Sequence, residues 1–254
     1  MTAAHDPAPA RSRGSVPART LTGRFGARAV VAAIGVLLVV VPLTLLVVLV
    51  LATSRRLRAV DQGMEDAVHR YVVARPALER ALEIGSVVLH PRVMWALAAI
   101  TFVALWVRGR RRHAVWAVVT IAIGGALDTP LKELIARARP VFPDPVATAP
   151  GYSFPSGHAL NTMVVAAGAV VLGRRATRDR LRQRAVLLLA AAALVLLTGF
   201  DRVGLGVHYP SDVVGGWLVG LATVLVTTAA FDIDVTPAER EPDETPDSGR
   251  EARR

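Results

Sequence analysis

Long apolar runs constrain this chain more than any other feature of its sequence. Residues 29–52 form a stretch of 24 residues without a charged side chain. As a helix this stretch would be about 36 Å long, which is enough to cross the hydrocarbon core of a bilayer. Further apolar runs cover residues 84–107, 114–136, 155–173, 185–200 and 213–231. With 53% hydrophobic residues and a mean hydropathy of +0.44, the sequence predicts an all-α, polytopic membrane protein with six transmembrane helices.

The segments outside these runs differ in character. Residues 1–28 and 232–254 are rich in proline and charged residues, so we expect two disordered cytoplasmic tails around a membrane domain at 29–231. Residues 53–83 carry apolar side chains at helical spacing among many charges, which predicts an amphipathic helix at the outer membrane interface between spans one and two. Pro76 is expected to end or restart that helix.

The basic residues indicate how the spans are oriented. The loops at 108–113 and 174–184 are rich in arginine, and the positive-inside rule places them in the cytoplasm together with both termini. The same parity places the loops at 137–154 and 201–212 on the non-cytoplasmic side of the inner (plasma) membrane. The net charge of +10 is therefore interpreted as membrane topology, and we expect no nucleic-acid partner.

Three short polar clusters interrupt the apolar sequence. They are Lys132–Pro140, which ends in Arg139-Pro140, then Pro155-Ser156-Gly157-His158, and then Arg202–Asp212, which contains His208. Parity places all three at one membrane face, so they can meet. Their side chains include three cations (Lys132, Arg139 and Arg202), two imidazoles (His158 and His208) and the carboxylate of Asp212, the groups that phosphoryl transfer through a histidine nucleophile requires.

Local chemistry supports an anion site at these clusters. Pro155 suits the first turn of a helix, so the backbone N–H groups of Ser156, Gly157 and His158 are expected to be free for an anion. Lys132 is the only lysine among 30 basic residues, which suggests that a compact ammonium is needed there. Asp128 lies four residues earlier in an apolar span, where an ionisable side chain needs a partner, either Lys132 or another cation of the site. Arg137 is interpreted as an interfacial anchor.

The spacing Lys-x6-Arg-Pro, Pro-Ser-Gly-His and Arg-x5-His-x3-Asp resembles the type 2 phosphatidic acid phosphatase superfamily over roughly residues 85–231. That family includes membrane lipid phosphatases, bacterial acid phosphatases and vanadium haloperoxidases. The resemblance implies phosphate binding by one group of residues and catalysis by another. The implied phosphate ligands are Lys132, Arg139, Ser156, Gly157 and Arg202; the implied catalytic residues are His208 as nucleophile, His158 as general acid and Asp212 as the partner of His208.

One position departs from the family pattern. Asp201 precedes Arg202, where the family usually has serine. An acid at this position either weakens anion affinity or orients the guanidinium. His5, His69, His90 and His113 lie outside the clusters and are assigned no chemistry.

The resulting hypothesis is a metal-independent lipid phosphatase that works through a phosphohistidine. No set of metal-binding side chains converges in the sequence, and three cations can neutralise phosphate, so we expect no metal and no cofactor. The expected partners are the bilayer and a lipid phosphate: phosphatidic acid, phosphatidylglycerol phosphate, or a polyprenyl phosphate or diphosphate such as undecaprenyl diphosphate. The alternatives are a lipid phosphotransferase with the same intermediate, a vanadium haloperoxidase, and a membrane scaffold with a silent site.

Overall fold

The computed structural model describes residues 18–143, 145–176 and 180–233, and within these ranges the chain forms helices and no strand. Of the two predicted tails, 1–28 and 232–254, residues 1–17 and 234–254 lie outside the described residues. The helices are α1 (Ala18–Leu51), α2 (Arg55–Val73), α3 (Pro76–Val88), α4 (Pro91–Val107), α5 (Arg111–Ile135), α6 (Gly157–Ala176), α7 (Leu181–Gly204) and α8 (Pro210–Ala230).

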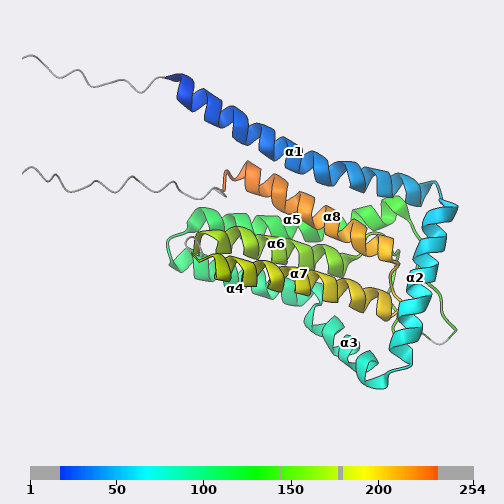
Figure 1. Cartoon of the computed structure of the whole chain (residues 1–254). Helices are drawn as coiled ribbons and strands as arrows, with labels where there is room; N and C mark the ends of the chain where they lie inside the picture. Colours follow the sequence, from blue (N-terminus) through cyan, green and yellow to red (C-terminus); the bar gives the residue numbers. More distant parts are fainter. Residues whose placement is uncertain (1–17, 144, 177–179, 234–254) are drawn as a thin grey trace, which may run out of the picture.

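Helix α6 is the centre of the bundle. It contacts α4, α5, α7 and α8, while α1 lies along α8 on the outside (Figure 1). Gly216 and Gly220 of α8 allow the closest approach, because a Cβ atom at these positions would lie 2.5 Å and 2.6 Å from the carbonyl oxygens of Ser156 and Leu160. These two glycines form the small-residue contact that brings α6 and α8 together.

Four helices are long and apolar enough to cross a membrane: the 33–51 part of α1, and α5, α7 and α8. A fifth crossing results if α3 and α4 are counted as one bent span. The described residues thus provide four or five such spans, and the prediction of six goes beyond this number. The difference lies in α6, which is not among the helices long and apolar enough to cross a membrane and which carries polar side chains such as His158, Asn161 and Thr162.

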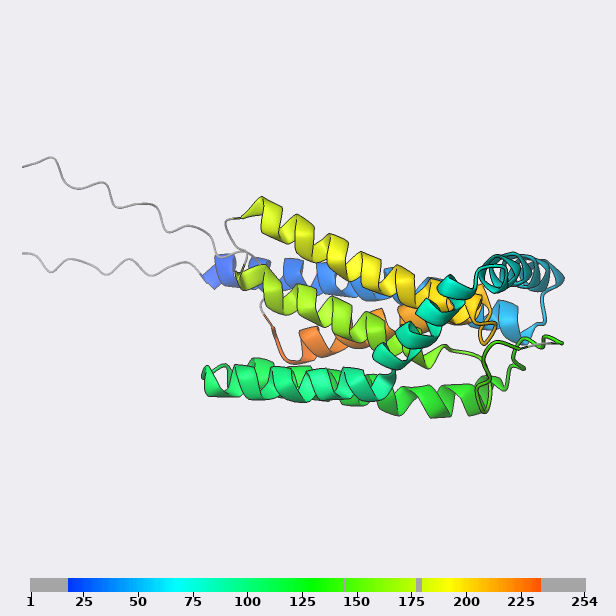
Figure 2. The ribbon, with the colours of Figure 1, turned by 90° about the horizontal axis from the view of Figure 1, so that it is seen from below.

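The apolar run at 84–107 was expected to be one uninterrupted span, and this expectation is wrong. The chain breaks at His90 between α3 and α4, whose axes differ by 46° (Figure 2). Pro91 occupies the first turn of α4, and the His90 side chain accepts a hydrogen bond from the Arg92 N–H at 3.2 Å. Proline cannot donate the helical hydrogen bond and favours an extended residue before it, so the helix restarts there.

The first helix also differs from expectation at its start. α1 begins at Ala18, within the segment 1–28 that was expected to be a disordered tail. Residues 18–28 contain no proline, and extending an existing helix costs much less than nucleating a new one, so the 29–51 helix continues backwards.

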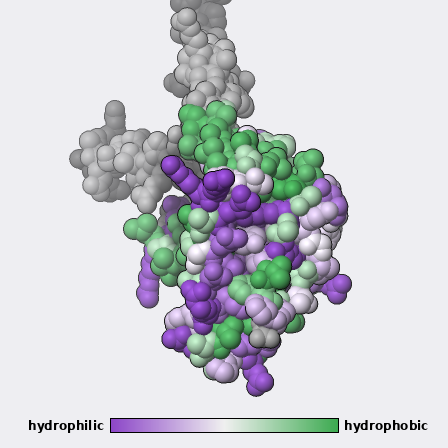
Figure 3. All heavy atoms as spheres, turned by 90° about the vertical axis from the view of Figure 1, so that its right-hand side faces the viewer, coloured by the Kyte–Doolittle hydropathy of each residue, from purple (hydrophilic) through white to green (hydrophobic). Residues whose placement is uncertain are grey.

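Helix α2 lies across one end of the bundle (Figure 1). It buries Asp61, Glu65, His69 and Val72, while Val60 and Met64 are about half exposed. Figure 3 views this end of the molecule and shows hydrophilic residues gathered across it, with hydrophobic residues along one margin. The residues that α2 buries thus include three ionisable side chains, Asp61, Glu65 and His69, at the end of the bundle where α5 finishes and where α6 and α8 begin.

Candidate active site

The three clusters converge at the end of the bundle that α2 covers. Lys132 and Arg139 come from the last turn of α5 and the loop after it, and Ser156, Gly157 and His158 come from the start of α6. The C-terminal turn of α7 supplies Arg202, while His208 and Asp212 lie just before α8 and in its first turn. His158 lies within electrostatic range of Arg202 and His208, so the two imidazoles share one site.

Lys132 is held by an acid of its own helix. Its Nζ atom lies 2.7 Å and 2.6 Å from the two carboxylate oxygens of Asp128. The same carboxylate contacts the start of α6, because a Cβ atom at Gly157 would lie 2.8 Å from Asp128 Oδ1. A larger residue at position 157 would push the Asp128 carboxylate away, so glycine allows Asp128, and with it the Lys132 ammonium, to lie beside the α6 N-terminus. The partner of Asp128 is therefore Lys132, one of the two options that the sequence left open.

Arg139 is fixed by carbonyl groups. Its Nη1 atom donates to the Val207 carbonyl at 2.8 Å, and its Nε atom donates to the Gly151 carbonyl at 3.0 Å. The same Nη1 atom lies 3.1 Å from Nε2 of His208. Burial lowers the pKa of Arg139, and the nearby Arg202 charge acts in the same direction against Asp212 and Asp128. The carbonyl groups thus hold the guanidinium against Nε2 of His208.

The α6 N-terminus differs in part from expectation. The Ser156 N–H donates to the Asp212 carbonyl at 2.9 Å, so the expectation that this N–H is free for an anion is wrong. The Ser156 Oγ atom instead caps α6, accepting from the Ala159 N–H at 3.5 Å. The reason is the close α6–α8 packing, which places the first turn of α8 directly against Ser156. Gly157 and His158 remain at the positive end of the helix dipole.

His208 has a different partner for each ring nitrogen. Its Nδ1 atom faces Asp212 Oδ2 at 3.6 Å, slightly beyond hydrogen-bonding distance, and its Nε2 atom faces Arg139. Burial lowers the pKa of His208 and, with smaller contributions from the charges of Arg139 and Lys132, prevails over Asp212, which acts to raise it. Burial therefore favours the neutral imidazole, and the Asp212 carboxylate faces its Nδ1 atom.

Arg202 is paired with the residue that departs from the family pattern. Both its Nε atom, at 2.7 Å, and its Nη2 atom donate to Oδ2 of Asp201. Its remaining terminal nitrogen, Nη1, lies 3.5 Å from Nε2 of His158. The structure favours orientation of the guanidinium as one role of Asp201, because the acid occupies one edge of Arg202 and leaves Nη1 toward the site.

Several residues at the site were missed or misread from the sequence. Arg137, interpreted as an interfacial anchor, instead contacts Asp212 at 2.6 Å and Asp61 at 2.7 Å. Burial opposes the charge of Arg137, but the two carboxylates outweigh burial and raise the pKa of its guanidinium. His90, assigned no chemistry, places its ring against that of His158, with the ring centroids 5.5 Å apart.

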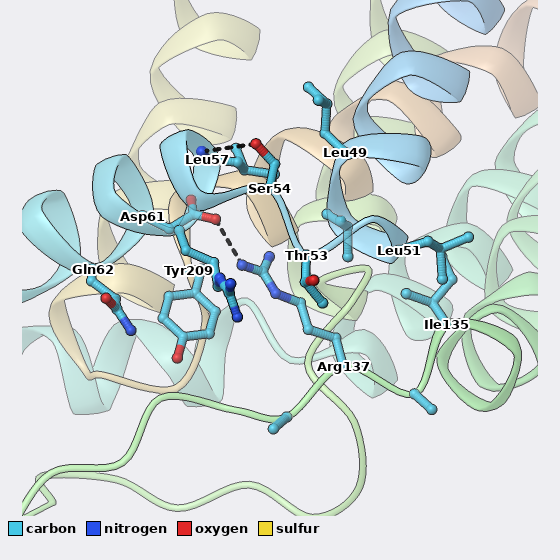
Figure 4. A pocket seen from close by; sticks show the side chains of 14 residues that line it. Leu49, Leu51, Thr53, Ser54, Leu57, Asp61, Gln62, Ile135, Arg137 and Tyr209 are labelled. Carbon is cyan, nitrogen blue, oxygen red and sulfur yellow. Dashed lines mark hydrogen bonds and ion pairs between the residues drawn. The ribbon is translucent and has the colours of Figure 1, made fainter.

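Asp61 and Arg137 line a groove of about 340 Å³ between the end of α1 and the start of α2 (Figure 4). The sequence pattern that could have indicated a role for Asp61 is the recurrence of ionisable residues at every fourth position in α2: Asp61, Glu65 and His69. Among the described residues, no group of three histidine or acidic side chains is arranged to hold a metal ion.

Comparison with known proteins gives relatives of one kind. The PAP2 superfamily profile matches residues 113–234. Phosphatidylglycerophosphatase B of Bacillus subtilis (strain 168) is 35% identical over 95 residues, 37% of this chain and 46% of the relative. An undecaprenyl-diphosphatase of Sulfolobus acidocaldarius is 31% identical over 126 residues, 48% of this chain and 56% of the relative. The chain thus spans about half the length of these two relatives.

A third relative is matched over more of its length. Decaprenylphosphoryl-5-phosphoribose phosphatase of Mycolicibacterium smegmatis is 34% identical over 154 residues, 59% of this chain and 77% of the relative. The fold is similar to the crystal structure of the first transmembrane PAP2 type phosphatidylglycerolphosphate phosphatase from Bacillus subtilis, with a TM-score of 0.64 and 24% identity. That similarity covers 76% of this chain and 95% of the other. Since the profile spans all three polar clusters, and the Mycolicibacterium relative aligns over most of its length, the chain belongs to the PAP2 superfamily.

Proposed function

We propose that this protein is an integral membrane lipid phosphatase that works through a phosphohistidine and needs no metal. The observation that carries the proposal is the placement of His208 between Asp212 on Nδ1 and Arg139 on Nε2. Lys132 and Arg202 lie near enough for their charges to act on His208 and on Arg139 respectively, so both would attract a phosphoryl group held beside Nε2. The relatives, which are named as phosphatases of lipid phosphates, support the same reaction class.

The residues divide the reaction into two steps. In the first, Nε2 of His208 forms a bond to phosphorus, the bond to the lipid oxygen breaks, and His158 gives a proton to that oxygen. In the second, water attacks phosphorus and gives a proton to His158, while the nitrogen–phosphorus bond breaks and releases phosphate. Lys132, Arg139 and Arg202, with the α6 N-terminus at Gly157, would hold the phosphoryl oxygens through both steps.

An apolar groove supports a substrate with a hydrocarbon tail. It encloses about 360 Å³ between α1, α5 and α8, and its wall includes Leu43, Leu127, Leu131 and Phe154. Leu131 adjoins Lys132, and Phe154 lies two residues before Ser156, so the groove ends close to the phosphate cluster. The proposed substrates are phosphatidic acid, phosphatidylglycerol phosphate and polyprenyl phosphates or diphosphates such as undecaprenyl diphosphate.

We propose six crossings: α1, the bent pair α3–α4, α5, α6, α7 and α8. α6 has 20 residues, about 30 Å of helix, and packs against α5, α7 and α8, which are each long and apolar enough to cross a membrane. Both termini would then be cytoplasmic, and the site would face the non-cytoplasmic side of the inner membrane. Helix α2 would lie in the outer interface, with Val60 and Met64 toward lipid.

The test is phosphate release by the purified protein from phosphatidic acid, phosphatidylglycerol phosphate and undecaprenyl diphosphate, without an added acceptor. His208→Ala should abolish release and leave thermal unfolding nearly unchanged. His113→Ala is the matched control, because it lies at the opposite end of α5, roughly 30 Å from Lys132 along the helix, and should keep full activity.

Orthovanadate should inhibit competitively, and EDTA should have no effect. Turnover retained in His208→Ala would remove the nucleophile assignment, and strong loss of activity in EDTA would indicate a metal enzyme. Phosphate transferred only when an alcohol acceptor is present would indicate a phosphotransferase.

A further inference from the structure

Arg137 connects two buried carboxylates from different helices. Its Nη1 atom donates to Asp212 Oδ1 and to the Ser211 hydroxyl, both at 2.6 Å, and its Nη2 atom donates to Asp61 Oδ2 at 2.7 Å. The Arg137 side chain is 13% exposed, so these bonds are little weakened by water. A planar guanidinium can bind both carboxylates at once in a fixed geometry, which a lysine cannot do.

Asp61 is anchored to the start of α8 as firmly as to Arg137. Its Oδ1 atom accepts from the Ser211 N–H at 3.0 Å, and its Oδ2 atom accepts from the Ser211 hydroxyl at 2.5 Å. The residue is 1% exposed, although it belongs to α2 and lies 151 positions before Asp212 in the chain. α2 thus places a carboxylate beside the residue that precedes Asp212.

The two oxygens of Asp212 have separate tasks as a consequence. Oδ1 is held by Arg137, while Oδ2 accepts from the Tyr209 N–H at 2.9 Å and faces His208 Nδ1. These hydrogen bonds to both oxygens restrain the carboxylate so that Oδ2 stays turned toward the imidazole. The charge of Arg137 would by itself offset that of Asp212, and the charge of Asp61 compensates for this, so Asp212 can still stabilise a cationic imidazole.

We infer that Asp61, acting through Arg137, is a positioning residue for Asp212 and thereby for the His208 nucleophile. This inference rests on the proposed function, because it assigns Asp61 a part in the reaction at the same site. The structural alternative is that Asp61 only attaches α2 to the bundle. The two differ in what a substitution changes: positioning affects the transition state, whereas attachment affects folding.

The first measurement is kcat and KM for phosphate release by the wild type and by Asp61→Asn. Asparagine keeps the shape of the side chain and loses the charge. We expect kcat to fall about tenfold to a hundredfold, as for other residues that orient a reactive group from behind, with KM changed less than about threefold. Asp66→Asn is the matched control: it lies on the same helix with an exposed side chain and should keep wild-type kinetics.

Asp61→Glu should restore most of the activity. The extra methylene can extend into the groove beside Asp61 and Arg137, which Figure 4 shows, and the charge is kept. A merely structural role would make glutamate at least as harmful as asparagine. If Asp61→Asn does not purify as folded protein, Arg137→Lys carries the same test, because lysine keeps the charge but holds only one carboxylate; the same loss in kcat is expected.

Orthovanadate provides a readout that does not depend on turnover. It resembles the transition state, so its affinity, measured by protection against thermal unfolding, should fall in Asp61→Asn in parallel with kcat. Equal kcat and equal vanadate affinity in folded Asp61→Asn would overturn the inference and leave the proposed function intact. A wild-type protein that releases no phosphate from any of the three lipids would overturn the proposed function, and the vanadate comparison would still decide the role of Asp61.

Discussion

Glu65 should make the stability of this protein fall as pH rises. The residue is one of the three ionisable side chains that α2 buries and is 3% exposed. Among the described residues, no group donates a hydrogen bond to its Oε1 atom. Burial raises the pKa of Glu65 from 4.5 to about 7, and the neighbouring Asp66 charge adds to the effect. The folded protein therefore holds a proton that the unfolded chain releases.

The sign and size of the effect follow from these two values. Below pH 4.5 both states are protonated and Glu65 carries no penalty. Between pH 4.5 and about 7 the unfolded chain loses its proton while the folded protein keeps it, so the free energy of unfolding decreases. Above pH 7 both states are ionised, and the loss levels off at about 3 kcal/mol.

Glu65→Gln removes this titration and leaves the other groups in place. Thermal unfolding in detergent should be followed from pH 4.5 to 8.5 for both proteins, and the difference between them isolates Glu65. We expect little difference at the acidic end and a growing advantage for the glutamine variant toward pH 8. Glu83→Gln, whose side chain is exposed, should give a difference that does not vary with pH. A flat difference for Glu65→Gln, or one that favours the wild type at high pH, would refute the reasoning.

Two further predictions concern Arg202 and topology. Asp201→Asn should lower the free energy of unfolding by about 3 kcal/mol, because it breaks a buried ion pair. It should also tighten orthovanadate binding about tenfold, because the charge of Asp201 no longer competes with the anion for Arg202. Thermal unfolding with and without vanadate measures both effects, and weaker vanadate binding would contradict the idea that Asp201 competes with the anion. The chain has no cysteine, so a membrane-impermeant maleimide should label Thr148→Cys and not Arg108→Cys in intact cells, and the opposite pattern would reverse the proposed orientation.

The sequence was most informative where chemistry and topology agree. The spacing of the three motifs identifies His158, Arg202 and His208 as site residues. The alternation of loops between the two membrane faces then predicts that their segments share one end of the bundle. The structure places them at one end, with Arg202 beside His158 and Arg139 beside His208. This agreement arises because the loops of a membrane protein lie at one of only two membrane faces, so loops on the same face can meet.

The remaining parts depend on contacts that no local pattern encodes. Apolar residues at helical spacing in 53–83 predict an apolar helix face, yet the side chains that α2 buries include Asp61, Glu65 and His69. Burial of Asp61 is favourable because Arg137 and Ser211 donate hydrogen bonds to its carboxylate, and both residues lie far from Asp61 in the sequence. The break at His90 was missed for a different reason, because hydropathy averaged over a window does not register a single proline.

Most cations of the site are paired with acids, so the site carries little net positive charge. Lys132 is paired with Asp128, Arg202 with Asp201, and Arg137 with Asp61 and Asp212, so four acids stand against these three cations and Arg139.

Among the described residues, Arg139 has no carboxylate within ion-pair distance and is held by carbonyl groups and His208 instead. An arriving phosphate can therefore bind Arg139 without displacing an acid, whereas it must compete for Lys132 and Arg202. The proposed reaction releases inorganic phosphate after every turnover, and acids beside two of the three proposed phosphate ligands would favour that release. Arg139, which has no carboxylate within ion-pair distance in the described part of the chain, lies beside Nε2 of His208, the proposed nucleophile.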